Sequence, residues 1–260
     1  MALNNFRFAV GSLNTRSLDA SGPGSYDSSR PRLFVLDHMI RDHRLDLLHL
    51  QETGRFHNEI LMKRFFFPDF HNAITSVGEI SQHSIACFYN PATLVHVSSS
   101  VLEVGRATLS IFRSKKNPEK VLASFNVYGF SGGARVDQQN QTNLLNIIGD
   151  SINLCKRDFL DLQVVLAGDF NADFLKPGSP KTRQLRAFAL THDLIEVSLP
   201  VESTWRARRG ENFSVSKIDH IFMTKFEDHR SFSFPCPSSD HLAVIASNRV
   251  KCKIKDPLPN

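Results

Sequence analysis

Acidic, amide and imidazole side chains stand at the ends of several short apolar runs in this sequence. These positions are Asn14, Glu52, Asp169 with Asn171, Asp219, and Asp240 with His241. Short apolar runs are typical of buried strands, and side chains at strand ends converge in a cleft of an α/β sheet. Crowded carboxylates need a cation, and oxygen ligands without a thiolate favour Mg²⁺ or Mn²⁺ over Zn²⁺. The pattern therefore predicts a divalent-cation site assembled from several strand ends.

Two further histidines lie inside predicted strands rather than at their ends. Side chains alternate along a strand, which turns His220 to the sheet face opposite Asp219, so we expect His220 to pack rather than to act in catalysis. His49 lies within a buried run and is expected to pack in the same way. The run Phe65-Phe66-Phe67 could stack on bases, but a chain with 21 phenylalanines favours a place in the core.

The spacing of apolar residues predicts the elements that position these side chains. Strands are expected at 6–13, 46–50, 84–89, 94–104, 107–112, 121–128, 163–167, 217–223 and 242–246. Helices are expected at 31–43, with Pro31 as the first helical residue, and at 58–67, 136–156 and 181–190. No interior stretch reads as a linker, so we expect one α/β domain over 1–260, with 249–260 as a tail or linker.

Length, charge and cysteine content limit the class of protein. The 260 residues are 41% hydrophobic, and 31 Lys and Arg against 26 Asp and Glu give a formal charge of +5. A pI near 9.1 suits a polyanionic partner, although an ordinary basic enzyme has the same balance. The widely separated cysteines favour neither a disulfide framework nor a zinc site. Without a signal-peptide pattern or a membrane-spanning apolar stretch, we expect a soluble intracellular protein that does not bind membranes.

In order and spacing, the strand-end motifs resemble those of the endonuclease/exonuclease/phosphatase family, which includes DNase I and the apurinic/apyrimidinic endonucleases. The motifs are Ser12-Leu-Asn14-Thr-Arg16-Ser-Leu18, Leu50-Gln-Glu52-Thr53, Gly168-Asp-Phe-Asn171-Ala, Ser216-Lys-Ile-Asp219-His-Ile221 and Ser239-Asp240-His241. They are more narrowly similar to the endonuclease domains of non-LTR (LINE-type) retrotransposons. The resemblance covers residues 6 to about 247 and implies a four-layer α/β sandwich, with two mostly antiparallel sheets packed face to face and helices outside.

The resemblance also implies roles for the clustered residues. Glu52 would hold the cation, and Asp240 would support the metal or its waters. Asn14 would either ligate the cation or orient the neighbouring carboxylates. Asp169 would align or deprotonate the attacking water, and Asn171 would contact the scissile phosphate.

The same resemblance pairs Asp219 with His241, which would donate a hydrogen bond to the phosphate. A carboxylate beside an imidazole raises the histidine pKa, so this pairing would keep His241 protonated at neutral pH. Tyr128 matches the family's tyrosine that contacts the metal site or phosphate. The family often continues Tyr-x-Pro-Asn, whereas this chain continues Gly129-Phe130-Ser131, so the resemblance does not carry over one amide contact to the phosphate. Ser131 or the backbone amides that follow it are the candidates to replace that contact.

A basic hairpin is expected just before the Asp219 strand. Its predicted tip carries Arg206, Arg208 and Arg209, and Thr204-Trp205 before them resembles the Thr-aromatic step of the LINE-type domains. A basic tip alone is compatible with simple solvation. The resemblance implies that these residues, together with Arg16, contact a DNA groove or its phosphates.

The resemblance implies a Mg²⁺-dependent endonuclease that nicks DNA and leaves a 3′-hydroxyl able to prime reverse transcription. Such a domain would act in the nucleus as a monomer, on its own or in a polyprotein with a reverse transcriptase. The alternatives are abasic DNA, RNA, a tyrosyl-DNA adduct or a lipid headgroup as substrate, or a catalytically dead binding module. The arginine-rich hairpin favours nucleic acid over lipid, and the intact metal and histidine positions disfavour a dead module.

Overall fold

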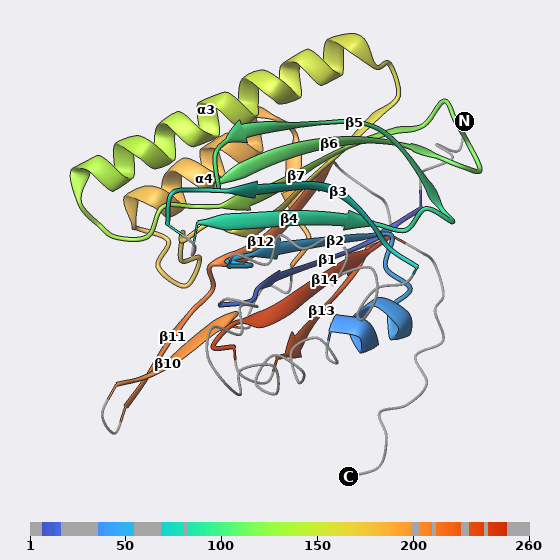
Figure 1. Ribbon diagram of the computed structural model, residues 1–260. Helices are drawn as coiled ribbons and strands as arrows, with labels where there is room; N and C mark the ends of the chain where they lie inside the picture. The colour runs from blue at the N-terminus through green and yellow to red at the C-terminus, as the bar shows by residue number, and fades with distance from the viewer. Residues whose placement is uncertain are drawn as a thin grey trace.

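Two six-stranded sheets pack face to face, with helices on the outside (Figure 1). The computed structural model describes residues 7–16, 36–54, 69–80, 83–198, 203–209, 212–224, 229–236 and 239–248. Within that part of the chain, only the β1–β2 and β7–β8 pairs are parallel among the paired strands. The expected four-layer sandwich of mostly antiparallel sheets is thus confirmed.

The first sheet has the strand order β13-β14-β1-β2-β4-β3. Its strands are β1 (Ala9–Asn14), β2 (Leu47–Gln51), β3 (His71–Val77), β4 (Ser84–Tyr89), β13 (Arg230–Pro235) and β14 (Leu242–Ser247). Residues 36–42 form a helix against its outer face, where Leu36, Met39 and Ile40 join the buried cluster of this sheet. This helix falls within the predicted 31–43, whose first residues lie outside the described part.

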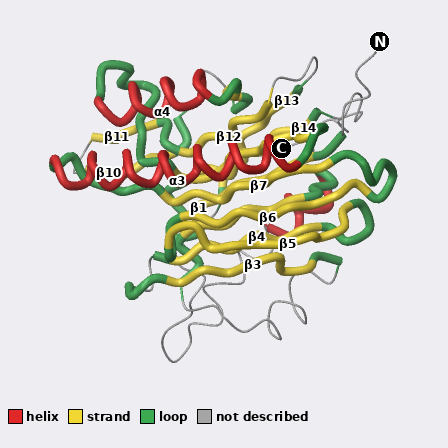
Figure 2. The backbone as a smooth tube through the Cα atoms, turned by 90° about the horizontal axis from the view of Figure 1, so that it is seen from above, coloured by secondary structure: helices red, strands yellow, loops and turns green. Residues whose placement is uncertain are grey.

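The second sheet has the order β5-β6-β7-β8-β12-β9. Its strands are β5 (Leu94–Glu103), β6 (Ala107–Ser114), β7 (Val121–Tyr128), β8 (Leu162–Asp169), β9 (Leu194–Glu196) and β12 (Asp219–Thr224). Helices α3 (Arg135–Asp158) and α4 (Pro180–Thr191) run along its outer face (Figure 2). The buried face of α3 includes Leu144, Ile148 and Ile152, which follow the predicted helical spacing.

A separate two-stranded hairpin joins β10 (Trp205–Arg209) to β11 (Asn212–Ser216). It lies where the sequence predicts a basic hairpin, and Figure 1 shows it extending away from the two sheets. No helix in the described part of the chain has the length and apolar character that crossing a bilayer requires.

The register of the strands explains how residues distant in sequence meet. In the first sheet, β1 and β2 are parallel and place Asn14 opposite Gln51. In the second sheet, Asp169 lies opposite both Tyr128 on β7 and Asp219 on β12. Apolar side chains from both inner faces fill the space between the sheets. The strand ends that carry Asn14, Tyr128, Asp169 and Asp219 therefore lie together along one edge of the sandwich, the shared edge.

The sequence does not predict three of the strands, which are β3, β9 and β13. Strand β3 is half-exposed and polar, β9 has three residues, and β13 is a half-exposed edge strand, so none carries a strong apolar run. The helix predicted at 58–67, with Phe65-Phe66-Phe67, lies outside the described residues. The other predicted elements are present, with bounds that differ by a few residues.

Candidate active site

Three residues at the shared edge adopt a left-handed backbone conformation that non-glycine residues seldom take. The φ angles are 48° at Arg16, 51° at Glu52 and 50° at Asn171. Such conformations cost about 1–3 kcal/mol each and persist where the surrounding structure enforces them, most often at functional sites. In each case the chain has just left a strand, namely β1, β2 or β8.

Glycine is required where β7 and β8 run side by side. Gly168 has φ of 153°, and a Cβ at this position would lie 1.8 Å from the Val127 carbonyl oxygen. A Cβ at Gly129 would lie 2.3 Å from the Phe170 carbonyl oxygen. These close approaches bring the Tyr128 and Asp169 strand ends together.

Asn14 connects the two sheets at the site. Its Nδ2 donates to Glu52 Oε1 over 2.8 Å and to Asp169 Oδ2 over 3.0 Å. Its Oδ1 accepts a hydrogen bond from the backbone N–H of Arg16 over 3.0 Å. The amide is fully buried, so these contacts fix its orientation. Its contacts are those of an orienting group, the second of the two roles expected for Asn14.

Glu52 receives a second hydrogen bond on the same oxygen. The Tyr128 hydroxyl donates to Glu52 Oε1 over 2.9 Å. Burial and the Glu52 charge raise the pKa of the Tyr128 phenol, which therefore stays protonated and donates. Within the described residues no donor reaches Glu52 Oε2, so that oxygen is open.

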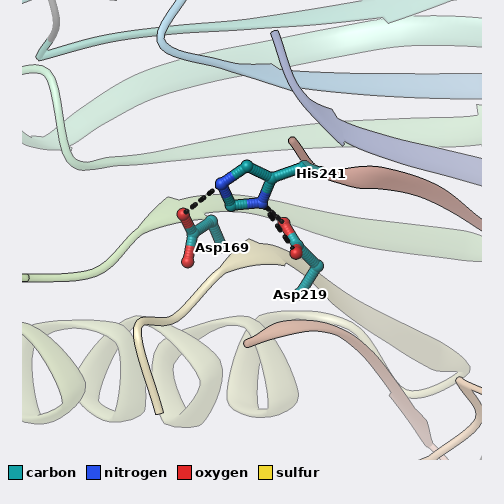
Figure 3. Close-up of side chains that lie close together, drawn as sticks. All are labelled: Asp169, Asp219 and His241. Atoms are coloured by element: carbon teal, nitrogen blue, oxygen red, sulfur yellow. Dashed lines mark hydrogen bonds and ion pairs between the residues drawn. The ribbon is translucent and has the colours of Figure 1, made fainter. Parts of the chain in front are cut away.

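His241 and Asp219 form a buried pair (Figure 3). His241 Nδ1 lies 2.9 Å from Asp219 Oδ2 and 3.1 Å from Oδ1. Burial acts to lower the pKa of His241, but the Asp219 carboxylate outweighs it and, with further acidic groups nearby, raises the pKa to about 9. The ring is thus an imidazolium at neutral pH, with Nε2 facing Asp169 as a proton donor.

Asp169 lies between the Asn14 amide and the His241 ring. Its Oδ1 accepts from the backbone N–H of Asn171 over 2.9 Å, and its Oδ2 is 4.0 Å from His241 Nε2. Burial, followed by the Asp219 charge, raises the pKa of Asp169 to about 7. A carboxylate with this pKa can accept a proton from water near neutral pH. Asn171 itself is held by its Nδ2, which donates to the Gly129 carbonyl over 3.1 Å.

Asp240 is held on one oxygen and open on the other. Its Oδ2 accepts from Arg16 Nη1 over 2.8 Å and from Trp205 Nε1 over 2.9 Å. Its Oδ1 is buried and has no hydrogen-bond partner among the described residues. His241 Nε2 lies 3.8 Å from this oxygen, beyond hydrogen-bonding distance. A buried carboxylate oxygen without a hydrogen bond is costly, and a cation or a water held by a cation would supply the missing contact.

The donor set fits a hard divalent cation. Glu52 and Asp240 each present one oxygen that is free of hydrogen bonds within the described residues. Atoms of Asp169, Asp219 and His241 also lie within 4.8 Å of one another, as in a metal site. The protonated His241 ring cannot ligate, however, so this trio is better suited to proton transfer. Oxygen-only donors suit Mg²⁺ or Mn²⁺.

Of the residues predicted to contact DNA, Thr204, Trp205 and Arg16 contact the cluster, and the three arginines belong to the hairpin strand β10. Thr204 Oγ1 accepts the backbone N–H groups of Ile218 and Asp219 over 3.0 and 2.9 Å, so it supports the Asp219 strand end. The Arg206 guanidinium lies 4.0 Å from the centre of the Phe213 ring, across the hairpin. Arg208 and Arg209 belong to β10, paired with Phe213 and Asn212 of β11. Arg16 and Trp205 both bind Asp240, as described above.

Two residues at the site were not singled out from the sequence. Ser239 Oγ donates to the Asn14 carbonyl and accepts from the His241 backbone N–H, over 3.0 and 3.1 Å. Its place in the Ser-Asp-His motif could have indicated this. Arg106 is buried beneath Tyr128 and belongs to no motif, so only the tertiary structure locates it.

His220 and His49 pack away from the cluster, as predicted. His220 is fully buried, with Nδ1 2.9 Å from Glu196 Oε1 and Nε2 2.9 Å from the Ala172 carbonyl oxygen. His49 is buried between the sheets, 2.7 Å from Ser124 Oγ.

Comparison with known proteins agrees with this architecture. The model of the endonuclease/exonuclease/phosphatase family matches residues 11–241. The endonuclease domain of TRAS1, a telomere-specific non-LTR retrotransposon, is 14% identical with a TM-score of 0.66, over 94% of this chain and 100% of that one. TDP2 from D. rerio, complexed with a single-strand DNA product, is 14% identical with a TM-score of 0.63, over 94% and 99%.

A third similar structure is a mannosyl-6-phosphatase from Bacteroides thetaiotaomicron. It is 18% identical with a TM-score of 0.64, over 92% of this chain and 98% of that one. A comparison with curated protein sequences found no match. At these identities the structural likeness shows the shared fold alone.

Proposed function

Because the chain belongs to the endonuclease/exonuclease/phosphatase family, whose members hydrolyse phosphoesters, we propose that it is a Mg²⁺-dependent endonuclease that nicks DNA to leave a 3′-hydroxyl. The observation that carries the proposal is the position of Asp169, between the Asn14 amide and the protonated His241 ring. A carboxylate that can accept a proton and an imidazolium that can donate one are therefore held close together at the shared edge.

Glu52 and Asp240 are the residues that would hold the cation, with Asn14 keeping the Glu52 carboxylate in place. A bound Mg²⁺ supplies positive charge against the phosphate oxygens and helps to position the reacting groups. Phosphodiester hydrolysis in water is so slow that catalysis must lower the barrier by roughly 20 kcal/mol or more, mostly through positioning and charge neutralisation.

The chain's own residues supply the proton transfers. Asp169, whose pKa is raised to about 7, aligns the attacking water and takes its proton. His241 donates a hydrogen bond to a phosphate oxygen as negative charge develops, while Asp219 keeps the ring protonated and oriented. Asn171 contacts the scissile phosphate through the second hydrogen of Nδ2, since the first is donated to the Gly129 carbonyl.

DNA is the proposed substrate because cationic side chains flank this cluster. Arg206 and the adjoining arginines of β10 lie on a hairpin whose base is joined to the site, since the Arg206 N–H donates to the Asp240 carbonyl over 2.9 Å. Neutralisation of phosphates by such side chains supplies most of the affinity of a protein for nucleic acid. Two similar structures support this choice, since one is the endonuclease domain of a retrotransposon and the other, TDP2 from D. rerio, is complexed with a single-strand DNA product.

A panel of substrates tests the proposal. The protein is incubated in Mg²⁺ with supercoiled plasmid, an abasic duplex, a 5′-tyrosyl oligonucleotide and mannose 6-phosphate, with EDTA as the control. The proposal expects nicking of the plasmid that EDTA abolishes. A preference for the abasic duplex by orders of magnitude would indicate a repair enzyme. Hydrolysis confined to mannose 6-phosphate would overturn the proposed substrate class.

A further inference from the structure

Arg106 lies directly behind the tyrosine of the site. It is the last residue before β6, is 6% exposed, and its guanidinium carbon is 4.6 Å from the centre of the Tyr128 ring. The backbones are joined as well, because the Tyr128 N–H donates to the Arg106 carbonyl over 2.7 Å. A buried cation this close to a phenol that binds Glu52 calls for an explanation, since burying a charge is costly unless its contacts compensate.

Two aromatic rings contact the guanidinium. The Phe130 ring centre also lies 4.6 Å from the guanidinium carbon, so the cation has cation–π contacts with both Tyr128 and Phe130. Phe130 occupies the position at which the family pattern has proline. Its backbone is fixed by two buried residues, since Phe130 N–H donates to Gln141 Oε1 over 3.0 Å and Lys181 Nζ donates to its carbonyl. The second ring is therefore held in place by α3 and α4.

The edges of the guanidinium are also bound. Arg106 Nη1 donates to the Gly129 carbonyl over 3.0 Å, the same oxygen that accepts from Asn171. Arg106 Nη2 donates to His83 Nε2 over 2.6 Å. Burial and the Arg106 charge lower the pKa of His83, which leaves this ring nitrogen free to accept. The planar guanidinium of Arg106 makes these two hydrogen bonds and the two ring contacts at once, which the ammonium of a lysine cannot do.

We propose that Arg106 is a positioning residue, which acts through Tyr128 to hold the Glu52 carboxylate in the orientation that binds the divalent cation. Tyr128 donates a hydrogen bond to Glu52 and Arg106 makes none to it within the described residues, so the tyrosine is the bonded link between them. The Arg106 charge also acts on Glu52 through space, and the substitution Arg106→Lys keeps that charge. The inference rests on the proposed function only in assuming that Glu52 binds a cation. It concerns the metal-binding step and not the choice of substrate.

The test is a double-mutant cycle on metal affinity, measured without substrate. Metal-free wild type, Arg106→Lys, Tyr128→Phe and the double variant are titrated with Mn²⁺, and free Mn²⁺ is followed by electron paramagnetic resonance. Groups that orient a metal ligand typically change affinity by 10- to 100-fold, so Arg106→Lys is expected to weaken Mn²⁺ binding by about tenfold. In the Tyr128→Phe background the same change is expected to have little further effect, because the connecting hydroxyl is gone.

Two further variants keep the result interpretable. Arg113→Lys, at an exposed position of β6, should bind Mn²⁺ as the wild type does. Phe130→Leu removes one of the two ring contacts while leaving Arg106 intact, and should weaken Mn²⁺ binding in the same direction even if Arg106→Lys does not fold.

If a folded Arg106→Lys variant binds Mn²⁺ as tightly as the wild type, the inference is overturned. It is also overturned if Arg106→Lys weakens Mn²⁺ binding as much in the Tyr128→Phe background as in the wild type. If Arg106→Lys does not fold, wild-type affinity in Phe130→Leu overturns it. A wild-type chain that binds no Mn²⁺ overturns it as well. A chain that binds Mn²⁺ but does not nick DNA contradicts only the proposed function.

Discussion

The side-chain amide of Asn14, at the end of β1, donates a hydrogen bond to Asp169, at the end of β8, across the interface between the two sheets. The same amide nitrogen donates to Glu52, so one buried group sets the spacing between the proposed cation ligand and the proposed base. The two halves of the sandwich therefore contribute to a single site.

Replacing Asn14 with alanine should separate these two carboxylates. A hydrogen bond to a charged group contributes about 1.5–3 kcal/mol, so Asn14→Ala is expected to lower the nicking rate by roughly 10- to 100-fold. The rate is measured under saturating plasmid and compared with Asn143→Ala, at an exposed position of α3. Equal rates in the two variants would contradict the role given to Asn14.

The pH dependence of nicking should report Asp169 and His241. Asp169 must lose its proton to act as a base, so the rate should rise with pH up to about 7, or to a lower pH when a bound cation stabilises the carboxylate. His241 must keep its proton, so the rate should fall as pH passes about 9. Initial rates between pH 5 and pH 10 would define both limbs, and a rate that still climbs well above pH 9 would exclude His241 as the proton donor.

Asp219→Asn should shift the alkaline limb of that profile. The substitution removes the carboxylate that does most to raise the pKa of His241, so the pKa should fall and the loss of rate should begin at a lower pH. Measuring the profile for this variant beside the wild type separates loss of charge from loss of folding. An unchanged alkaline limb would show that Asp219 does not control the protonation of His241.

The sequence predicts the fold class and the strand ends that carry the candidate site, but it does not predict three of the strands. Glu52 and Asp169 follow strong apolar runs and Asp219 stands at the start of one, so the rule that strand ends converge locates them without any knowledge of the register. Strand β9 is too short for such a pattern to be visible. The bond from Arg16 to Asp240 joins residues 224 positions apart, and nothing local in the sequence encodes it.

Trp205→Phe should test the link between the hairpin and Asp240. The substitution keeps an aromatic ring but removes the N–H that donates to Asp240 Oδ2 over 2.9 Å. A hydrogen bond to a charged group contributes about 1.5–3 kcal/mol. Nicking by Trp205→Phe should therefore be roughly tenfold slower at low Mg²⁺, and the rate should recover as the Mg²⁺ concentration is raised. A defect that is independent of Mg²⁺ concentration would assign Trp205 to DNA contact alone.

Glu196→Gln should reduce stability rather than alter the chemistry directly. Glu196 Oε1 lies 2.6 Å from Nζ of Lys217, which is 1% exposed, and 2.9 Å from His220 Nδ1. Burial would raise the pKa of Glu196, but these partners lower it to about 2. Breaking a buried pair costs about 3–5 kcal/mol, which urea unfolding can measure.

The same pair sets a pH window for stability. Because the folded pKa of Glu196 lies below its unfolded value, the contribution is fully present above pH 4.5 and is lost as pH falls towards 2. Wild-type and Glu196→Gln proteins should therefore approach each other in stability at acid pH. A difference that stays constant over this range would contradict the assignment.

The central claim is that the protein nicks DNA in a metal-dependent reaction in which protonated His241 is the proton donor. The most direct test examines the ends of the nick. Supercoiled plasmid is treated in Mg²⁺ with wild type or His241→Ala, and the nicked product is offered to a DNA polymerase with labelled nucleotides. The account predicts that wild-type nicks are extended, because they end in a 3′-hydroxyl, and that His241→Ala is slower by about 100-fold or more. Nicks that the polymerase cannot extend, or equal nicking by His241→Ala, would contradict it.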